Sequence, residues 1–533
     1  RMRRPSARVA LSMIVLTGWM TVAGAQDAGV EPLAPSPAQD DTTNAMMQDQ
    51  PLGVIPQPTP ESPGLVTGVT LGELYTDNLR LAGPGKDKQS SWITEIQPFV
   101  KAATGGPRFS GMVDFSLTGY LYTGGSHRHQ LAQNLHTQGT LTVLPEHFFI
   151  QGAATYGRAV INNEMPSGAG TFFLDNNRAN IATASLSPYW IQEFGNAGTA
   201  MVRYAHARVV YNTRGIPGEG RASTGPVNLD HPGESRTLLA GVSNATSDAV
   251  QATLVSPEGR TFGWDLGYSA QRIERDRGGP AARFARAKAG IYWQVNAETR
   301  LLADAGKENK YLPDGSVEIL AAPFWDAGFQ WSAARDTLKV LVGHRFYGRS
   351  GEFSWTHTAA LLRTTVRYIE QPTDLNQQLL GQGSIGIGLP PPTDVNQIPS
   401  LTQRRIYLMK RASFSADYEM PHGHLGLMLY DESRRYFTLN NQREKIANAS
   451  LSWLLELGPF STLTPTVGWQ RYRYLDAHVN YTRYVQVALV HQINPSNFGS
   501  LRYRNDSRNA YFGIPGAHGY RVNVLFLEWT HLF

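Results

Sequence analysis

Alternation of apolar and polar residues with period two is the feature that most constrains this chain. From residue 65 to residue 533 it runs in segments of about 8 to 16 residues, without a sustained helical period. In 338–347, for example, Leu338 and Val340 lie on one face and Lys339 lies on the other. Successive side chains of a β-strand point to opposite faces, so the pattern predicts an all-β fold.

The connections between these segments alternate in length. Tight turns such as 334–337 and 420–424 alternate along the chain with longer polar loops such as 162–175 and 372–403. Tight turns at one rim and long loops at the other are typical of transmembrane outer-membrane β-barrels. An even strand number follows if both chain ends lie in the periplasm. We therefore expect an antiparallel barrel of about 22 strands, with 18 to 22 as the range.

Two points in this layout are irregular. The segment 351–358 is short for a membrane-spanning strand. Residues 246–258 are interpreted as an unusually long periplasmic turn between strands 233–245 and 259–274. These irregularities are the reason that the strand number is given as a range.

The last alternating segment ends on an aromatic residue. Counting back from Phe533, His531 and Trp529 share a face, opposite Thr530 and Glu528. A terminal aromatic residue on such a strand resembles the assembly signal of bacterial outer-membrane barrels. His531 departs from that signal, in which an apolar residue or tyrosine is usual. We expect Trp529 and Phe533 to form the assembly signal, with the barrel assembly machinery as a partner.

The region before the barrel has two parts. Residues 1–25 combine a basic start, an apolar run and Ala23-Gly24-Ala25, the order of regions in a cleaved secretory signal peptide. Residues 26–63 are acidic and rich in proline, which is typical of an extended or disordered linker, here in the periplasm. The barrel is then expected over 64–533, in the bacterial outer membrane.

Composition excludes several classes of protein. The chain has no cysteine, which excludes disulfides, thiolate metal sites and a cysteine nucleophile. Outside residues 1–25, no run approaches the roughly 18 apolar residues of a membrane-spanning helix. The high aromatic content excludes disorder for most of the chain.

Motifs for catalysis or cofactor binding are weak. Residues 381–386 match G-x-G-x-x-G, but three prolines follow where a nucleotide-binding helix would begin. His127, His129 and His136 lie close in sequence but lack the carboxylate or cysteine spacing of a metal site. We therefore predict no catalytic, cofactor-binding or metal residues, no cofactor and no nucleic-acid partner.

The polar faces of the strands carry many basic residues. If the apolar faces contact lipid, these residues line the lumen, together with one acid. The predicted pore-lining residues are Arg286, Lys288, Lys339, Arg345, Arg411, Arg502, Arg504, Asp506 and Arg508. Two interpretations stay open: ordinary polar faces with partly paired charges, or a cationic lumen that concentrates anionic solutes.

Several short stretches resemble a known family. Tyr75–Leu79, Thr94–Pro98, Phe324-Trp325, His344–Gly348 and Arg504–Arg508 are similar to those of the outer-membrane β-barrel proteins associated with PEP-CTERM systems in Gram-negative bacteria. The resemblance covers most of residues 65–533. That family is associated with exopolysaccharide loci, so the resemblance implies a role in polymer export. It implies no catalytic residues, because none is defined for the family.

The function expected from these features is a non-enzymatic outer-membrane channel that exports an anionic exopolysaccharide. A general diffusion porin is the alternative, and an outer-membrane hydrolase that assembles its Ser, His and Asp from different strands is a third. The expected partners are outer-membrane lipid and lipopolysaccharide, the exopolysaccharide and periplasmic export components. The apolar, glycine-rich loop 372–403 is expected to fold inward and narrow the pore.

Overall fold

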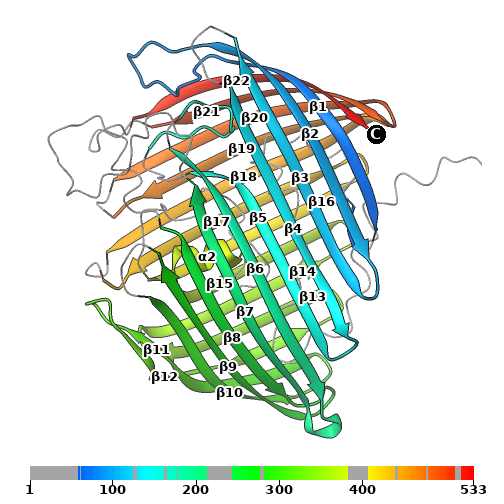
Figure 1. The fold of residues 1–533 in the computed structure, drawn as a ribbon. Helices are drawn as coiled ribbons and strands as arrows, with labels where there is room; N and C mark the ends of the chain where they lie inside the picture. Colours follow the sequence, from blue (N-terminus) through cyan, green and yellow to red (C-terminus); the bar gives the residue numbers. More distant parts are fainter. Residues whose placement is uncertain are drawn as a thin grey trace, which may run out of the picture.

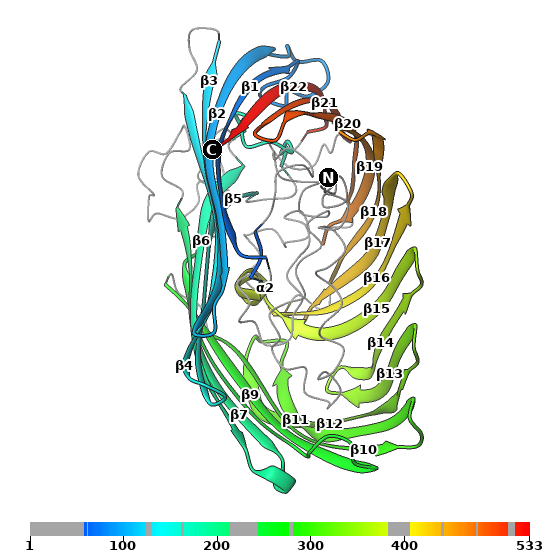
Figure 2. The same ribbon diagram turned by 90° about the vertical axis from the view of Figure 1, so that its right-hand side faces the viewer.

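A computed structural model shows the chain as a single β-barrel (Figures 1 and 2). The residues it describes are 58–60, 62–123, 129–160, 165–175, 177–212, 243–276, 281–381, 406–438, 442–475, 478–509 and 518–533. The predicted signal peptide and all but the end of the predicted linker lie outside these residues. The first strand begins at Gly64.

The barrel wall consists of 22 strands. Their bounds are β1 Gly64–Thr76, β2 Ser91–Gly105, β3 Phe109–Tyr122, β4 Gln130–Leu144, β5 Phe148–Val160, β6 Arg178–Glu193, β7 Thr199–Asn212, β8 Ala245–Val255, β9 Phe262–Arg275, β10 Ala282–Gln294, β11 Thr299–Tyr311, β12 Val317–Ser332, β13 Asp336–Arg345, β14 Gly348–Thr358, β15 Leu362–Thr373, β16 Tyr407–Met420, β17 Gly423–Tyr436, β18 Arg443–Gly458, β19 Ser461–Arg473, β20 Val479–Asn494, β21 Asn497–Arg508 and β22 Tyr520–Leu532. A 3₁₀ turn, η1 Gly195–Ala197, precedes β7, and the helix α2 Leu375–Gly381 follows β15.

The sheet closes because the first strand pairs with the last. β1 runs antiparallel to β2 on one side and to β22 on the other, with Gly68 opposite Leu532. The hydroxyls of Thr70 and Thr530 lie 2.8 Å apart across this seam. A closed sheet leaves no strand edge in the membrane. Each unpaired backbone N–H or C=O in the hydrocarbon core would cost on the order of several kcal/mol.

The two faces of the wall differ as the alternation predicts. On β21, Leu501 and Tyr503 are 45% and 44% exposed, whereas Arg502 between them is 5% exposed. The apolar residues therefore cover the outer face and the polar residues are buried on the inner face. An apolar outer surface over strands of at least ten residues suits a bilayer. The protein is an outer-membrane barrel, and its outer face contacts lipid.

The predictions of fold class, strand number and cellular location are confirmed. Neighbouring strands are antiparallel throughout, and the connections at one rim are short. The other rim carries the long connections, although β11–β12 and β13–β14 are joined there by short turns as well. Phe533 lies at the rim of tight turns. We take the rim of long connections as extracellular, as in other outer-membrane barrels.

One predicted strand was misplaced. β8 occupies Ala245–Val255, the stretch interpreted as a long turn, and the turn to β9 is short. Small residues cause the error, because Ala245, Ser247 and Ala249 fill the inner positions and weaken the apolar contrast. The predicted strand 233–245 lies almost entirely outside the described residues. The short segment 351–358 belongs to a longer strand, Gly348–Thr358.

Helical structure is sparse. In the described part of the chain, no helix has the length and apolar character needed to cross a membrane. The helix α2 has seven residues. Its importance comes from its position, which Figure 2 shows to be inside the barrel.

Substituting glycine at the closing seam tests the closure. A Cβ on Gly68 would lie 2.6 Å from the carbonyl oxygen of His531, whereas a Cβ on Gly152 in β5 would lie 3.8 Å from its nearest neighbour. We expect Gly68→Ala to destabilise the folded barrel by about 1–3 kcal/mol. The measurement is the temperature at which the fast-migrating folded band is lost on a detergent gel.

Gly152→Ala is the matched control, and it should leave this temperature unchanged or raise it slightly, because alanine is less flexible than glycine in the unfolded chain. Equal effects of the two substitutions would contradict the idea that the β1–β22 seam is tightly packed.

Candidate functional site

Two described segments from the long connections lie inside the barrel. The first, residues 165–175 between β5 and β6, is called the strap. The second is α2, in the connection between β15 and β16 (Figure 2). Both contact inner-face residues of the wall. They therefore narrow the lumen, which makes the lumen the candidate functional site.

The strap is anchored to the closing seam by two phenylalanines. Phe172 and Phe173 are 1% and 2% exposed and pack in one cluster with Leu74 of β1 and Val524 and Phe526 of β22. The rings of Phe172 and Phe526 meet edge to face, 5.8 Å apart between centroids. This is a favoured geometry for aromatic pairs. Burial of each ring stabilises the docked strap by about 1.5–3 kcal/mol.

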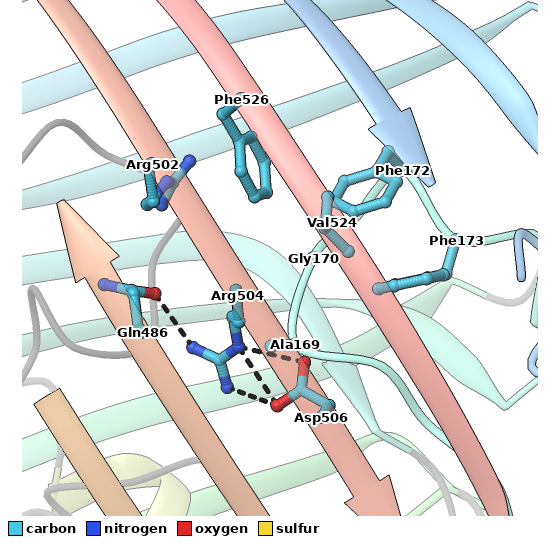
Figure 3. A pocket seen from close by; sticks show the side chains of 10 residues that line it. All are labelled: Ala169, Gly170, Phe172, Phe173, Gln486, Arg502, Arg504, Asp506, Val524 and Phe526. Atoms are coloured by element: carbon cyan, nitrogen blue, oxygen red, sulfur yellow. Dashed lines mark hydrogen bonds and ion pairs between the residues drawn. The ribbon is translucent and has the colours of Figure 1, made fainter. Parts of the chain in front are cut away.

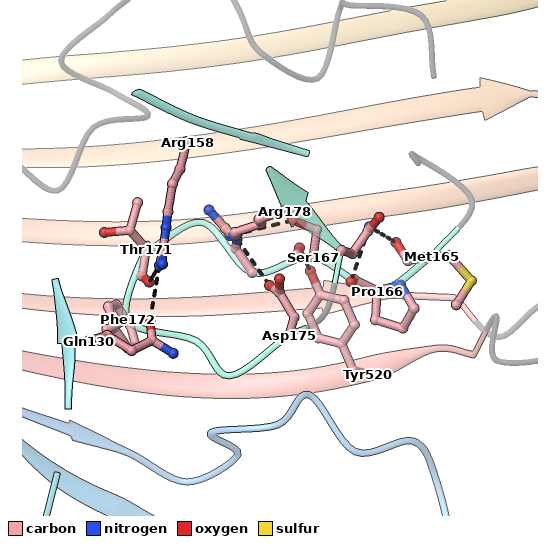
Figure 4. A network of polar contacts seen from close by, with 12 residues as sticks. Gln130, Arg158, Met165, Pro166, Ser167, Thr171, Phe172, Asp175, Arg178 and Tyr520 are labelled. Atoms are coloured by element: carbon pink, nitrogen blue, oxygen red, sulfur yellow. Dashed lines mark hydrogen bonds and ion pairs between the residues drawn. The ribbon is translucent and has the colours of Figure 1, made fainter. Parts of the chain in front are cut away.

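Side chains of the wall satisfy the carbonyl groups of the strap (Figure 4). The hydroxyl of Tyr520 in β22 donates to the carbonyl oxygen of Ser167 at 2.6 Å. The hydroxyl of Tyr122 in β3 donates to the carbonyl oxygen of Phe172, also at 2.6 Å. Because the strap has no strand partner, such bonds replace the ladder that a strand would provide.

Two arginines near the ends of β5 and β6 add charge-assisted bonds to the strap (Figure 4). Arg158 donates to the carbonyl oxygen of Thr171 at 3.2 Å and to Gln130 of β4 at 3.0 Å. Arg178 forms an ion pair with Asp175 at 3.1 Å. The strap is thus tied to β4, β5 and β6 as well as to the seam.

A cleft lies between the strap and the inner wall (Figure 3). Arg504 donates to both carboxylate oxygens of Asp506, at 2.9 and 3.0 Å, and Arg502 pairs with Glu528 at 3.1 Å. The Arg502 guanidinium also lies 3.8 Å from the centroid of the Phe526 ring. The cavity volume of about 10 Å³ is far below that of ligand pockets, about 300–1,000 Å³. The cleft is therefore a packing seam under the strap.

The apolar face of α2 packs on the inner face of the wall. Leu375, Leu379 and Leu380 are buried, and spacing by four residues places side chains on one face of a helix. Their partners on β5, β6 and β7 are Ala159, Ala179, Ile181, Ala207 and Val209. Since only Asp374 separates the end of β15 from α2, this end of β15 lies close to the wall that the helix contacts.

Polar contacts fix the start of α2 on β9. Asp374 accepts a bond from the backbone N–H of Gln377 at 2.8 Å, as a helix-capping residue does. Its carboxylate also pairs with Arg275 of β9 at 2.8 Å, and both side chains are buried. The side chain of Gln377 donates to Gln271 of the same strand at 2.9 Å.

Burial raises the pKa of Asp374 above its ordinary value, against the opposing effect of Arg275 and of backbone hydrogen bonds. A raised pKa in the folded state means that the contribution of this group to stability is largest at low pH and decreases as the pH rises through that pKa. Within the described residues, Arg275 is the charged partner of the ionised form. Docking of α2 and formation of the pair are coupled.

Most of the predicted pore-lining bases are paired with inner-face carboxylates. The pairs are Arg286–Asp326 at 3.1 Å, Lys288–Asp265 at 2.8 Å, Lys339–Glu352 at 2.9 Å, Arg345–Glu308 at 3.3 Å, Arg411–Glu432 at 2.6 Å, Arg502–Glu528 at 3.1 Å and Arg504–Asp506 at 2.9 Å. Arg508 donates to the carbonyl oxygen of Met165 in the strap. Whether these residues line a solute pathway stays a prediction.

Apart from Asp506, sequence reasoning missed the acidic partners of these bases, although a signal was present. Glu432 and Glu528 occupy inner positions of their strands by the same alternation that selected the bases. Counting acids as well as bases on the inner faces would have predicted the pairing. The strap also had a signal, because Phe172 and Phe173 are adjacent aromatic residues within an otherwise polar loop.

Two further predictions are placed by the structure. The loop 372–403 does fold inward over its described part, which ends at residue 381, and 382–403 lies outside the described residues. Trp529 lies on the outer face, stacked on His531 at 5.7 Å between ring centroids, and Phe533 is 81% exposed. The role of Trp529 and Phe533 in assembly stays a prediction.

The described residues give no support to the nucleotide-binding or histidine motifs of the sequence. Of the G-x-G-x-x-G stretch, only Gly381 is described, and it ends α2. His127 lies outside the described residues. Among those that are described, including His129 and His136, no group of three or more metal-ligating side chains is found. The prediction that the protein binds no metal is not tested by this.

One serine–histidine contact among the described residues bears on the hydrolase alternative. The hydroxyl of Ser461 lies 2.8 Å from Nδ1 of His491, across the β19–β20 pair at the rim of tight turns. In a serine triad the serine contacts Nε2, and an acid orients the imidazole through Nδ1. The observed contact uses the nitrogen that the acid would need, so it does not match that arrangement.

Comparisons with known proteins give distant structural likenesses. No protein-family model matches the chain, and no curated protein matches it in sequence. The FrpB iron transporter of Neisseria meningitidis is 10% identical, with a TM-score of 0.44 over 88% of this chain and 82% of that one. The siderophore receptor PirA of Acinetobacter baumannii is 6% identical, with a TM-score of 0.46 over 90% and 81%. The ferric enterobactin receptor PfeA of Pseudomonas aeruginosa is 10% identical, with a TM-score of 0.44 over 90% and 81%.

The functional prediction is corrected by these findings. The solved barrels similar to this chain are iron and siderophore receptors, so the prediction of an exopolysaccharide export channel, with a diffusion porin as the alternative, is wrong. The inner wall agrees with the correction, because carboxylates neutralise its bases and two segments narrow the lumen. The resemblance to the PEP-CTERM-associated family is not tested by any comparison.

Removing the partner of Asp374 tests the docking of α2. We expect Arg275→Gln to leave a buried carboxylate without its charged partner, at a cost of about 3–5 kcal/mol to the docked state. The amides of 375–380 should then exchange with deuterium faster by at least an order of magnitude. Arg272→Gln, on the same strand but exposed on the outer face, is the control. Slow exchange in both variants would show that the pair does not hold the helix.

Proposed function

We propose that this protein is a gated outer-membrane transporter that admits a bulky solute from outside the cell. The observation that supports this most directly is the strap and α2 docked inside a barrel of 22 strands. Barrels of 16–18 strands leave an aqueous channel, whereas outer-membrane transporters with 22 strands have an obstructed lumen. Strand number and lumenal content favour the same class.

The size of the barrel supports a large solute. Barrel diameter grows with strand number, so this lumen would exceed that of a porin if the strap and α2 were displaced. A permanently open pore of that width would pass small molecules without selection. Segments held by discrete contacts can instead open and close, because each contact can be broken without unfolding the wall.

The position of the gate supports uptake. The strap and α2 both belong to long connections, which lie at the extracellular rim. A solute that arrives from outside would therefore meet these segments first. We propose transport without catalysis, and we extend no cargo from the similar barrels to this chain.

Loosening the strap tests the proposal. In Phe172→Ala/Phe173→Ala, the apolar anchor of the strap is removed, at a cost of about 3–5 kcal/mol per ring. We expect the single-channel conductance in planar bilayers to rise several-fold, with frequent transitions between levels. Liposomes containing the variant should also swell in solutes that the native protein excludes.

Phe115→Ala is the matched control, since Phe115 is an exposed phenylalanine on the outer face of β3. It should leave conductance and swelling unchanged. Both variants are first checked for the heat-sensitive mobility of a folded barrel. If the double variant folds and has the conductance of the native protein, the gate is refuted. The gate is also refuted if the native protein already has the single-channel conductance of an open 22-stranded barrel.

A further inference from the structure

A group of basic side chains lies on the outer face of β17 to β20, near the strand ends at the rim of long connections. In β18, Glu444 and Ile446 are buried on the inner face. Arg443 and Lys445 alternate with them, so they point outward and are exposed. The same alternation applies to the neighbouring strands. The group, called the outer basic patch, consists of Arg435, Arg443, Lys445, Arg471, Arg473 and Arg483.

Strand register brings like charges directly opposite one another in this patch. Arg435 of β17 stands opposite Arg443 of β18, and Lys445 of β18 stands opposite Arg473 of β19. Directly opposed residues have Cβ atoms about 4.5–5.5 Å apart, and like charges at that distance are destabilising. The arrangement is costly unless an anion compensates it.

The described residues compensate the patch only at one edge. Glu370 attracts the charge of the half-buried Arg435, whose guanidinium lies 5.9 Å from the centroid of the Phe437 ring. None of the six members forms an ion pair among the described residues. Of the acids on nearby outer faces, Glu370 pairs with Lys410 at 2.9 Å, and Asp431 stands opposite Ala447. On β7 and β9 the exposed bases differ, since Arg208 lies 3.4 Å from Asp276 and Arg272 pairs with Glu274.

The patch borders the apolar belt of the barrel. On the outer face of β19, Arg473 and Arg471 are followed by Trp469 and then Val467, which is 45% exposed. The ring of Trp469 lies 6.3 Å from that of Tyr481 on β20. Aromatic residues of this kind mark the membrane interface of outer-membrane barrels. The patch therefore lies at the level of the headgroups of the outer leaflet.

We propose that the outer basic patch binds the phosphate groups of lipid A, the phosphorylated glycolipid anchor of lipopolysaccharide. Phosphate accepts several charge-assisted hydrogen bonds from arginine and lysine, and bases near an anionic membrane surface each add to binding. A headgroup with two phosphates suits two opposed pairs of like charges. The inference is independent of the gating proposal, because the patch lies on the face of the wall away from the lumen.

The test uses the purified full-length barrel in detergent and lipid A as the probe. The native protein should bind lipid A with two phosphates more tightly than monophosphoryl lipid A. Arg435→Gln/Arg443→Gln/Lys445→Gln/Arg473→Gln should weaken binding at least about tenfold. Without lipid A, the same variant should unfold at the same temperature as the native barrel or a higher one, because repulsion is relieved. With lipid A, it should lose the stabilisation that the native barrel gains.

Arg208→Gln/Arg272→Gln is the control, since it removes two exposed bases elsewhere on the outer face, and it should bind lipid A as the native protein does. Native affinity in the fourfold variant would overturn the proposal. Displacement of lipid A by inorganic phosphate at equal concentration would also overturn it, because the site would then recognise free anions. If the fourfold variant does not fold, two other measurements replace it. One is lipid A binding by Lys445→Gln/Arg473→Gln, and the other is binding by the native protein in about 0.05 and 0.5 M salt. If neither the double substitution nor the added salt weakens binding, the proposal is overturned.

Discussion

The hydrocarbon core of a membrane offers no hydrogen-bond partners, and this constraint determines most of the structure. Every backbone N–H and C=O in the spanning segments must be paired within the protein, so an all-β chain can cross only as a closed sheet. The antiparallel pairing of β1 with β22 meets that requirement. The apolar outer face and polar inner face then follow from the alternation of side chains along each strand.

Closure with 22 strands creates a wide interior, which the protein fills from its own long connections. The strap uses aromatic burial and tyrosine hydroxyls, whereas α2 uses leucines and one buried ion pair. Carboxylates on the same strand or on strands nearby pair with most of the predicted pore-lining bases.

Periodicity was sufficient to predict the wall of the barrel but not its contents. Fold class, strand number and location follow from alternation and connection length, both of which are local properties of the sequence. β8 was misplaced because Ala245 and Ala249 give little contrast between its faces. The docking of Phe172 on Phe526 and of α2 on Ile181 joins segments that are far apart in the sequence. Such contacts cannot be deduced from one strand at a time.

The strap rests on the same strands that close the barrel, and this has a mechanical consequence. Its phenylalanines contact β22, and their cluster includes Leu74 and Ile93 of β1 and β2. Lifting the strap would expose the apolar inner side of the junction between the first and last strands. Each opening would therefore weaken the wall at the one place where its two chain ends meet. If the strap is the gate that we propose, its closed state stabilises the wall, and opening depends on the stability of that junction.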